Sequence, residues 1–291
     1  MIRETRFGHA HPPRRRRMQA RDRVGRSVGY AILIVLSAGS VAPLVWMVLT
    51  SLRPGNTVFE SLIPAHLTGA AYQYAWSQMH ILTYFGNSVY VTALTVALVL
   101  IISLLAGYGF GRLRFRGREI LFIALMSALF LPAPAILVPV FVELKELRLI
   151  GTRVGLSLVY VATGVPFATL LMRAFFASLP GELADAAKID GAGELRIFWH
   201  VMLPLAGPGI ATISIFQVLF TWNELMFANA LIQNQSSLPL QPELYTVVGD
   251  YTKNWPVLTA ALTISVVPIL VVYVFLQRWY VAGLTAAALK G

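Results

Sequence analysis

Six long apolar stretches dominate this sequence, and each is close to the length that crosses a lipid bilayer as a helix. A hydrocarbon core of about 30 Å requires about 20 helical residues. We expect helices at 28–51, 85–108, 120–142, 154–176, 208–231 and 257–280. Hydrophobic residues make up 57% of the chain and charged residues only 12%, too few to cover the surface of a soluble enzyme. The sequence therefore predicts an all-α membrane protein with six transmembrane helices.

Two of these stretches need separate treatment. Pro132, Pro134 and Pro139 interrupt the third, so we expect it to be kinked or broken. The first follows a basic segment, as a signal peptide would. Residues 28–52 are too long for the apolar region of a typical signal peptide, however, and small residues suited to cleavage come too early. We therefore expect a retained first helix.

The distribution of basic residues predicts the orientation of the chain. There are 23 Lys and Arg against 13 Asp and Glu. Eighteen of the basic residues fall on the side of the membrane that holds both termini, and five fall on the other side. Cytoplasmic loops carry the excess of Lys and Arg, so both termini are expected in the cytoplasm.

The first 27 residues form a basic tail in this interpretation. Its run Arg14–Arg17 would suit nucleic acid or anionic lipid headgroups. We favour a topology anchor on membrane lipid and expect no nucleic-acid partner, because no folded nucleic-acid module accompanies the run.

The residue inventory predicts no catalytic, cofactor or metal site. The chain has no cysteine, and its histidines lack metal-ligand spacing. None of its four lysines follows a glycine, as the Gly-Lys-Ser/Thr of a phosphate-binding loop requires. If ATP drives this protein, hydrolysis must occur on another chain.

The connection at about 177–207 is unusually long, and its composition predicts two short helices. Leu183, Ala186, Ala187 and Asp190 share one face of the first, and Gly191 suits its C-terminal cap. On the second short helix we expect an apolar stripe like that of an interfacial amphipathic helix, formed by Leu195, Phe198, Trp199 and Met202. From physics alone, this hairpin could dock into a groove on a partner or lie on the membrane surface.

Three motifs carry a resemblance. Glu182–Ala192, followed by Phe198 and Leu203–Leu205, resembles the EAA loop of ABC-importer permeases, with Asp185 where that family usually has Glu. Trp222-Asn223-Glu224 and the ending from Gly283 to Gly291 resemble the carbohydrate-uptake, maltose-permease-like branch, with Ala287 in place of a usual Gly. The resemblance covers residues 28–291.

This resemblance implies a permease subunit of an ATP-driven, binding-protein-dependent importer for a sugar or oligosaccharide. It implies a prokaryotic inner-membrane location, a second permease subunit, two ATP-binding subunits that use ATP and Mg²⁺, and an extracytoplasmic solute-binding protein. The subunit itself would be no enzyme. The residues that would couple it to the ATPases are Glu182, Leu183, Asp185, Ala186, Ala187, Asp190 and Gly191.

Polar residues in the expected spans indicate a candidate solute path. Glu224 is the only acid that we place inside a span, and intramembrane acids are often functional. The candidates are Asn87, Gln217, Trp222, Asn223 and Glu224. Such residues also hold helices together, and Glu224 could lie in a hydrated vestibule. A second hypothesis is an ion-coupled secondary transporter with Glu224 as the ion carrier.

Overall fold

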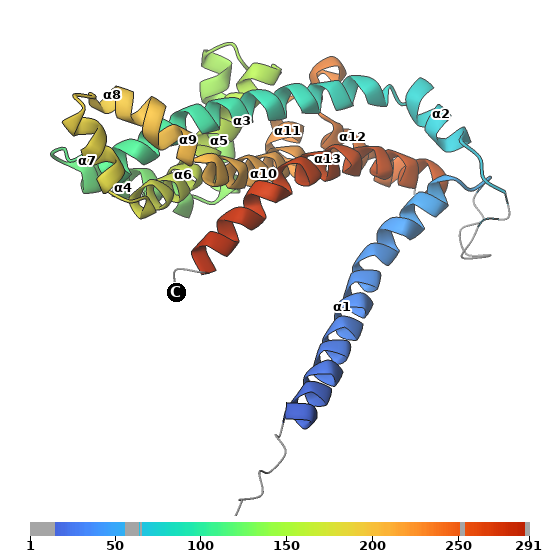
Figure 1. Ribbon diagram of the computed structural model, residues 1–291. Coiled ribbons are helices and arrows are strands. Elements are labelled where there is room, and N and C mark those ends of the chain that lie inside the picture. The colour runs from blue at the N-terminus through green and yellow to red at the C-terminus, as the bar shows by residue number, and fades with distance from the viewer. Residues whose placement is uncertain (1–14, 56–63, 65, 251–253, 289–291) are drawn as a thin grey trace, which may run out of the picture.

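The computed structural model describes residues 15–55, 64, 66–250 and 254–288, and these residues form helices joined by turns. In the part of the chain that the structure describes, four helices, all drawn in Figure 1, are long and apolar enough by composition to cross a membrane. They are α1 Arg15–Ser51, α3 Ile81–Arg112, α6 Arg153–Ser178 and α13 Trp255–Ala288. Helix α1 begins within the expected basic tail, at Arg15 instead of residue 28. Residues 1–14 of that tail, and the terminal Lys290 and Gly291, lie outside the described residues.

The third apolar stretch is broken, as its prolines predict. Helix α4, Arg118–Ser127, continues through a 3₁₀ turn, η1 Ala128–Phe130. Helix α5, Ala133–Glu146, then leaves at an angle of 104°. Leu131 and Pro132 are extended at the corner, since a proline disfavours helical backbone in the residue before it.

The fifth stretch is also broken, which the sequence did not predict. Helix α10, Gly207–Asn223, ends at an extended Glu224, and α11, Met226–Leu231, follows. The placement of Glu224 inside a continuous span 208–231 is therefore wrong, because the carboxylate caps the amide groups of a new helix. A further helical run, Glu194–Leu205, precedes α10 at an angle of 72°.

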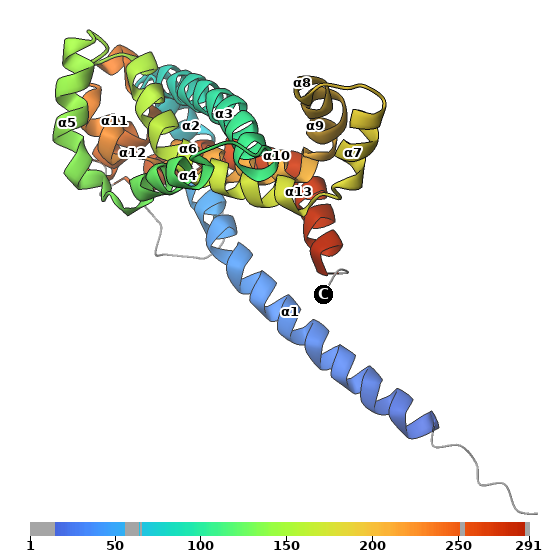
Figure 2. The ribbon, with the colours of Figure 1, turned by 90° about the vertical axis from the view of Figure 1, so that its left-hand side faces the viewer.

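The remaining elements are short. They are α2 Ala70–Ser77, α7 Glu182–Ile189, α8 Glu194–Ile197, the π-turn η2 Phe198–Met202, α9 Leu203–Leu205, η3 Gln235–Ser237 and α12 Leu240–Asp250. Helices α7, α8, η2 and α9 form one hairpin, residues 182–205, which stands as a separate lobe beside the end of α3 (Figure 2).

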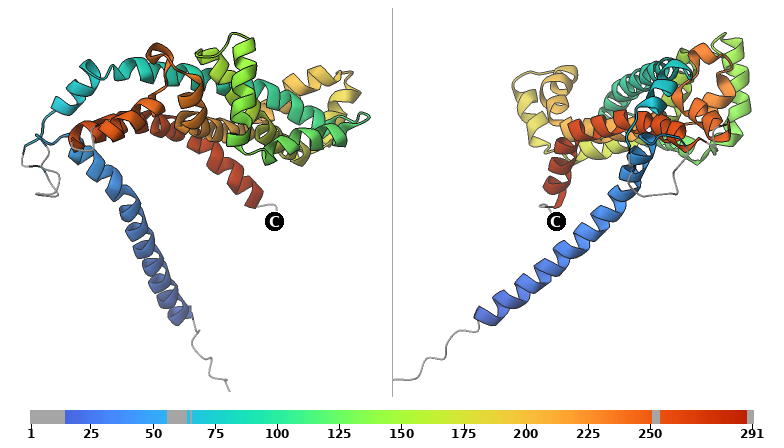
Figure 3. Two further views of the ribbon diagram at one scale, coloured as in Figure 1. Left: turned by 180° about the vertical axis from the view of Figure 1, so that it is seen from behind. Right: turned by 90° about the vertical axis from the view of Figure 1, so that its right-hand side faces the viewer.

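Helix α1 leaves the body of the protein at a steep angle, whereas α3, α6, α10 and α13 run alongside one another (Figure 3). The most apolar 18-residue stretch of α1 has no residue buried within the described part of this chain, whereas Thr50 and Ser51 at the end of the helix are buried. An apolar helix of this length requires lipid or another apolar protein surface around it.

Helices α3 and α6 cross closely near the hairpin. A Cβ built on Gly107 would lie 2.4 Å from Cβ of Met172, and one on Gly111 would lie 3.0 Å from the carbonyl oxygen of Arg173. Small residues four apart let two apolar helices approach backbone to backbone. The Gly107-x-x-x-Gly111 spacing therefore brings the α3 backbone close to α6.

Buried apolar residues gather in three clusters along the body. One joins α2, α12 and the starts of α3 and α13. A second, at the other end, joins the ends of α3 and α6 to the hairpin. A third joins α5, α6 and α11. The hairpin is thus packed onto the transmembrane body and does not hang from it as a free loop.

Candidate functional site

Helix α7 ends as the sequence predicts, in a glycine with left-handed backbone. Gly191 has φ +78°, the Gly191 amide donates to the Lys188 carbonyl at 3.0 Å, and the Ala192 amide donates to the Ala187 carbonyl at 2.9 Å. This pair of bonds is the Schellman arrangement, which satisfies the last carbonyls of a helix. Glu182 and Asp185 lie in the first turn, where the helix dipole favours acids.

The two sides of α7 differ in what covers them. Ala184, Ala187 and Ala192 pack against the second cluster. Leu183, Ala186 and Asp190 are exposed, as is Ile189 with 87% of its surface accessible. Three of the four residues expected on one docking face are therefore open, whereas Ala187 faces the body. The free surface combines Leu183, Asp185, Ala186, Ile189 and Asp190, and we call it the α7 free face.

The predicted stripe on the second segment is wrong. Phe198 and Met202 are buried, but Leu195 is 75% exposed and Trp199 is also exposed. Two causes explain this result. Residues 198–202 form a short π-helical segment, which changes the register of the side chains. In addition, Ile197 and Phe198 pack onto α3 and α6. The segment is anchored on protein, and its outer side carries Leu195 and Trp199.

Hydrogen bonds tie the hairpin to the end of α3. The Tyr108 hydroxyl donates to Oε2 of Glu194 at 2.9 Å, and Nζ of Lys188 lies 2.9 Å from Oε1 of Glu194. The hydrogen bond from Lys188 lowers the pKa of the Glu194 carboxyl, and that from Tyr108 acts in the same direction. One carboxylate thus contacts both α3 and α7.

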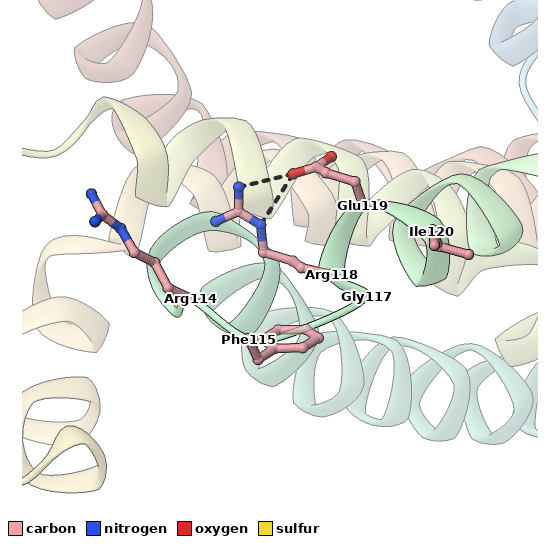
Figure 4. A pocket seen from close by; sticks show the side chains of 6 residues that line it. All are labelled: Arg114, Phe115, Gly117, Arg118, Glu119 and Ile120. Atoms are coloured by element: carbon pink, nitrogen blue, oxygen red, sulfur yellow. Dashed lines mark hydrogen bonds and ion pairs between the residues drawn. The ribbon is translucent and has the colours of Figure 1, made fainter.

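Arginine side chains bond to the C-terminal end of α6 and to the turn between α3 and α4. The Arg112 guanidinium donates to the carbonyls of Phe176, at 2.7 Å, and Leu179. In the turn, Arg118 pairs with Glu119 (Figure 4), and Arg173 of α6 contacts the same carboxylate at 2.9 Å. A cavity of about 760 Å³ lies between this turn and the hairpin, with Arg112, Asp185, Lys188 and Glu194 among its lining residues.

Glu224 occupies the break between α10 and α11. Its carboxylate accepts hydrogen bonds from the amides of Phe227, at 3.0 Å, and Ala228, at 3.2 Å, and from the Tyr160 hydroxyl of α6. The carboxylate therefore caps α11 and joins it to α6. A carboxylate whose oxygens accept these three hydrogen bonds has a structural role at the start of α11.

The other four path candidates also form hydrogen bonds to protein groups. The Asn87 amide donates to the carbonyls of Ser236 and Leu238, both at 2.9 Å, and accepts from Arg153 at 3.1 Å. Gln217 is buried beside Gly164, and its amide donates to the Thr221 hydroxyl at 3.1 Å.

Trp222 is only 4% exposed and donates to the Ser265 carbonyl at 3.0 Å, with its ring against Phe85. It is therefore unavailable for stacking on a solute in this conformation. Asn223 is exposed, and its side-chain oxygen accepts from Gln241 at 3.1 Å. Of the five candidates, Asn223 is thus the most accessible to a solute.

Sequence reasoning missed several residues of both sites. Tyr108, Tyr160 and Arg153 act through partners distant in the chain, which no local pattern reveals. The Gly107-x-x-x-Gly111 spacing in an apolar stretch was a usable signal. Among the described residues, no group of three or more acids and histidines is placed to hold a metal ion.

Comparison with known proteins decides the family. Residues 99–285 match the family described as the inner membrane component of binding-protein-dependent transport systems. The chain belongs to this family. The prediction of a permease subunit of a binding-protein-dependent importer is thereby confirmed. The matched region includes the hairpin and both bent helix pairs.

Related permeases support the carbohydrate-uptake branch. The diacetylchitobiose uptake permease NgcG of Streptomyces coelicolor is 34% identical over 88% of this chain and 86% of its own length. The arabinooligosaccharide transport permease AraQ of Halalkalibacterium halodurans is 31% identical over 91% of this chain and 95% of its own. The names of these relatives agree with the branch that the Trp-Asn-Glu and C-terminal motifs predicted.

Solved structures agree on the fold. A chain of a bacterial ABC transporter that imports the acidic polysaccharide alginate superposes with a TM-score of 0.76 at 25% identity. The match covers 94% of this permease and all of that chain. The all-helical importer-permease fold is therefore shown, with four apolar spans, or up to six if each bent pair crosses once.

Proposed function

We propose that this permease is one half of a solute gate whose hairpin is moved by ATP-hydrolysing partner subunits. The α7 free face carries the proposal, because it leaves Ile189 and Leu183 exposed on a short helix whose other side is packed onto α3 and α6. A helix of eight residues is not stable alone in water, so this packing pre-forms it for a partner.

The proposed coupling residues are the seven that the EAA-like motif indicates. Leu183, Ala186 and Asp190 would contact an ATPase groove directly, and Glu182 and Asp185 would add charge at the start of α7. Gly191 would hold the end of α7 in shape through its left-handed backbone. Ala187 would act from the inner side, by seating α7 on the body.

For topology we propose six spans, with each bent pair crossing once and both termini in the cytoplasm. The excess of Lys and Arg on the hairpin side supports this orientation. The break at Leu131–Pro132 would lie within the third span, where neighbouring helices can satisfy the freed backbone groups. Residues 1–27 would lie in the cytoplasm, partly as an extension of α1.

The proposed gate requires several partner subunits. Two ATP-binding subunits would use ATP and Mg²⁺, a second permease subunit would complete the path, and an external solute-binding protein would deliver the solute. A solved alginate transporter of the same fold was crystallised with a periplasmic protein loaded with alginate pentasaccharide, which supports this last partner for the fold. The assembly would sit in a prokaryotic inner membrane, among lipids and without nucleic acid.

The solute that we propose is a sugar or oligosaccharide. This rests on the relatives, whose names include the uptake of diacetylchitobiose and arabinooligosaccharides. In this permease, Asn223 is the accessible polar group at the α10 end, and Glu224 and Trp222 would shape the path around it. Asn87 and Gln217 would support the path by holding α3 and α10 in place.

The ion-coupled alternative has less support. It requires Glu224 to bind and release an ion during each cycle, yet its carboxylate holds the start of α11 and the Tyr160 hydroxyl. Release of these hydrogen bonds would leave the first amides of α11 without their acceptor at every turnover.

The direct experiment is purification of the tagged permease from cells that co-express its genomic neighbours. We expect ATPase subunits to co-purify, and Ala186→Trp to reduce ATPase stimulation by the complex, because a bulky ring on the α7 free face blocks close docking. Ala133→Trp, at an exposed site on α5, is the matched control. Solute uptake driven by an ion gradient without any ATPase subunit would contradict the proposal.

A further inference from the structure

The structure assigns Tyr108 and Glu194 a role as positioning residues that make α3 move together with the hairpin. This inference rests on the proposed ATP-driven gate and extends it. A hairpin placed between α6 and α10 in sequence would be expected to move those two helices. The contacts add α3, which lies about 70 residues earlier in the chain, to the moving unit.

The first support is the hydrogen-bond chain. Glu194 is the first residue of α8, and its two carboxylate oxygens accept separately from Tyr108 of α3 and Lys188 of α7. A shift of either arm of the hairpin therefore acts on the same carboxylate. Hydrogen bonds to a charged acceptor are shorter and stronger than those between neutral groups.

The second support is the packing of the Tyr108 ring. It is buried, and its centroid lies 5.6 Å from that of Phe176 in α6 and 5.1 Å from that of Phe198 in η2. The contact with Phe176 is edge-to-face and that with Phe198 is tilted, and aromatic pairs at these separations stabilise one arrangement of the rings. Tyr108 thus contacts α6 through its ring and the second arm of the hairpin through both its ring and its hydroxyl, and it reaches α7 only through the Glu194–Lys188 pair.

The third support is the close crossing of α3 and α6. Gly107 lies directly before Tyr108, and a Cβ there would collide with Met172. Arg112 adds hydrogen bonds from α3 to the last carbonyls of α6. Densely packed helices with such contacts move as a unit, because interiors have few voids into which they could slide. The hairpin, α3 and the end of α6 consequently form one rigid body.

The experiment uses pairs of spin labels on cysteines in the purified importer complex. The natural chain has no cysteine, so each introduced pair on this subunit is unique within it. Labels at Leu105 on α3, Arg196 on α8 and Tyr273 on α13 occupy exposed positions on the three elements. Distances are measured without nucleotide and after trapping with ATP, Mg²⁺ and orthovanadate.

We expect the 105–196 distance to stay constant while the 105–273 and 196–273 distances change together. With Tyr108→Phe or Glu194→Gln, the 105–196 distribution should broaden and the 105–273 shift should be lost, whereas the 196–273 shift remains. Tyr30→Phe, on the exposed surface of α1, is the matched control and should leave all three distances as in the natural chain.

Two outcomes would contradict the inference in distinguishable ways. A 196–273 shift without any 105–273 shift in the natural sequence would show that the hairpin moves without α3, and would leave the ATP-driven gate intact. If none of the three distances changes on trapping with ATP and vanadate, the proposed ATP-driven gate is contradicted, and the inference with it.

Discussion

At the scale of single residues, the two sites depend on groups that fix backbone. Gly191 ends α7 with φ +78°, and Glu224 supplies the acceptors that start α11. Both residues act by fixing backbone conformation, and neither has to contact a solute or a partner for its loss to matter. Their loss would act through the shape of the hairpin or of the α10–α11 break.

Gly191→Ala should weaken coupling. A left-handed backbone costs a residue with a Cβ about 1–2 kcal/mol, which is about 5- to 30-fold in the population of the intact helix end. ATPase stimulation of the purified complex measures this loss. Gly193→Ala is the matched control, because Gly193 has φ −72° and open space around its Cα. Equal activity of the two variants would contradict the role given to Gly191.

Glu224→Gln should destabilise the permease by about 1–3 kcal/mol, because an amide accepts the hydrogen bonds of Phe227, Ala228 and Tyr160 less strongly than a carboxylate. Thermal unfolding of the purified complex measures the effect. In a double-mutant cycle, Tyr160→Phe should add little to Glu224→Gln, since the first change already weakens the bond that the second removes. A variant of unchanged stability that abolishes an ion-gradient-driven uptake would instead favour the secondary-transporter hypothesis.

At the scale of elements, the helix crossings depend on glycine. Gly107 and Gly111 bring α3 onto α6, and Gly164 leaves room for the Gln217 side chain of α10. The sequence predicted the long helices and the α7 cap well, because periodicity, length and the Gly signal are local. It missed the Glu224 break and the π-turn at 198–202, because both depend on partners in α6 and α3.

Gly107→Ala should lower the midpoint of thermal unfolding, since its methyl group would lie 2.4 Å from Cβ of Met172 and force α3 away from α6. Gly109→Ala is the control within the same helix. Its Cβ meets nothing within 4 Å, so the change should be neutral or stabilise the helix by up to about 1 kcal/mol. Similar melting of the two variants would show that the crossing is looser than the structure indicates.

At the scale of the whole molecule, long helices join the proposed coupling end of the permease to its proposed path end. The hairpin lies at the ends of α3 and α6 and packs in the second cluster (Figure 1). The Glu224 break lies at the start of α11, whose buried residues belong to the third cluster. The EAA-like motif and the polar residues in the apolar stretches indicated this division in the sequence. They could not predict how α1 diverges from the body, because its most apolar stretch has no residue buried by the described part of the chain.

Orientation can be tested with single cysteines, since the natural chain has none. A membrane-impermeant maleimide should label Gln233→Cys from the outside of intact cells. It should label Arg196→Cys only in inside-out vesicles, because the proposed topology places the hairpin in the cytoplasm. Both residues are exposed in the structure. Labelling of the two from the same side would contradict the proposed topology.

Cross-linking from Ile189 tests the central claim most directly, because this side chain is the most exposed apolar group of the α7 free face. In the purified importer, Ile189→Cys treated with a short bifunctional maleimide should form a product that contains an ATPase subunit, whereas Gln233→Cys should not. The account is contradicted if Ile189→Cys yields no such product while the ATPase subunits, carrying accessible cysteines, remain bound to the complex.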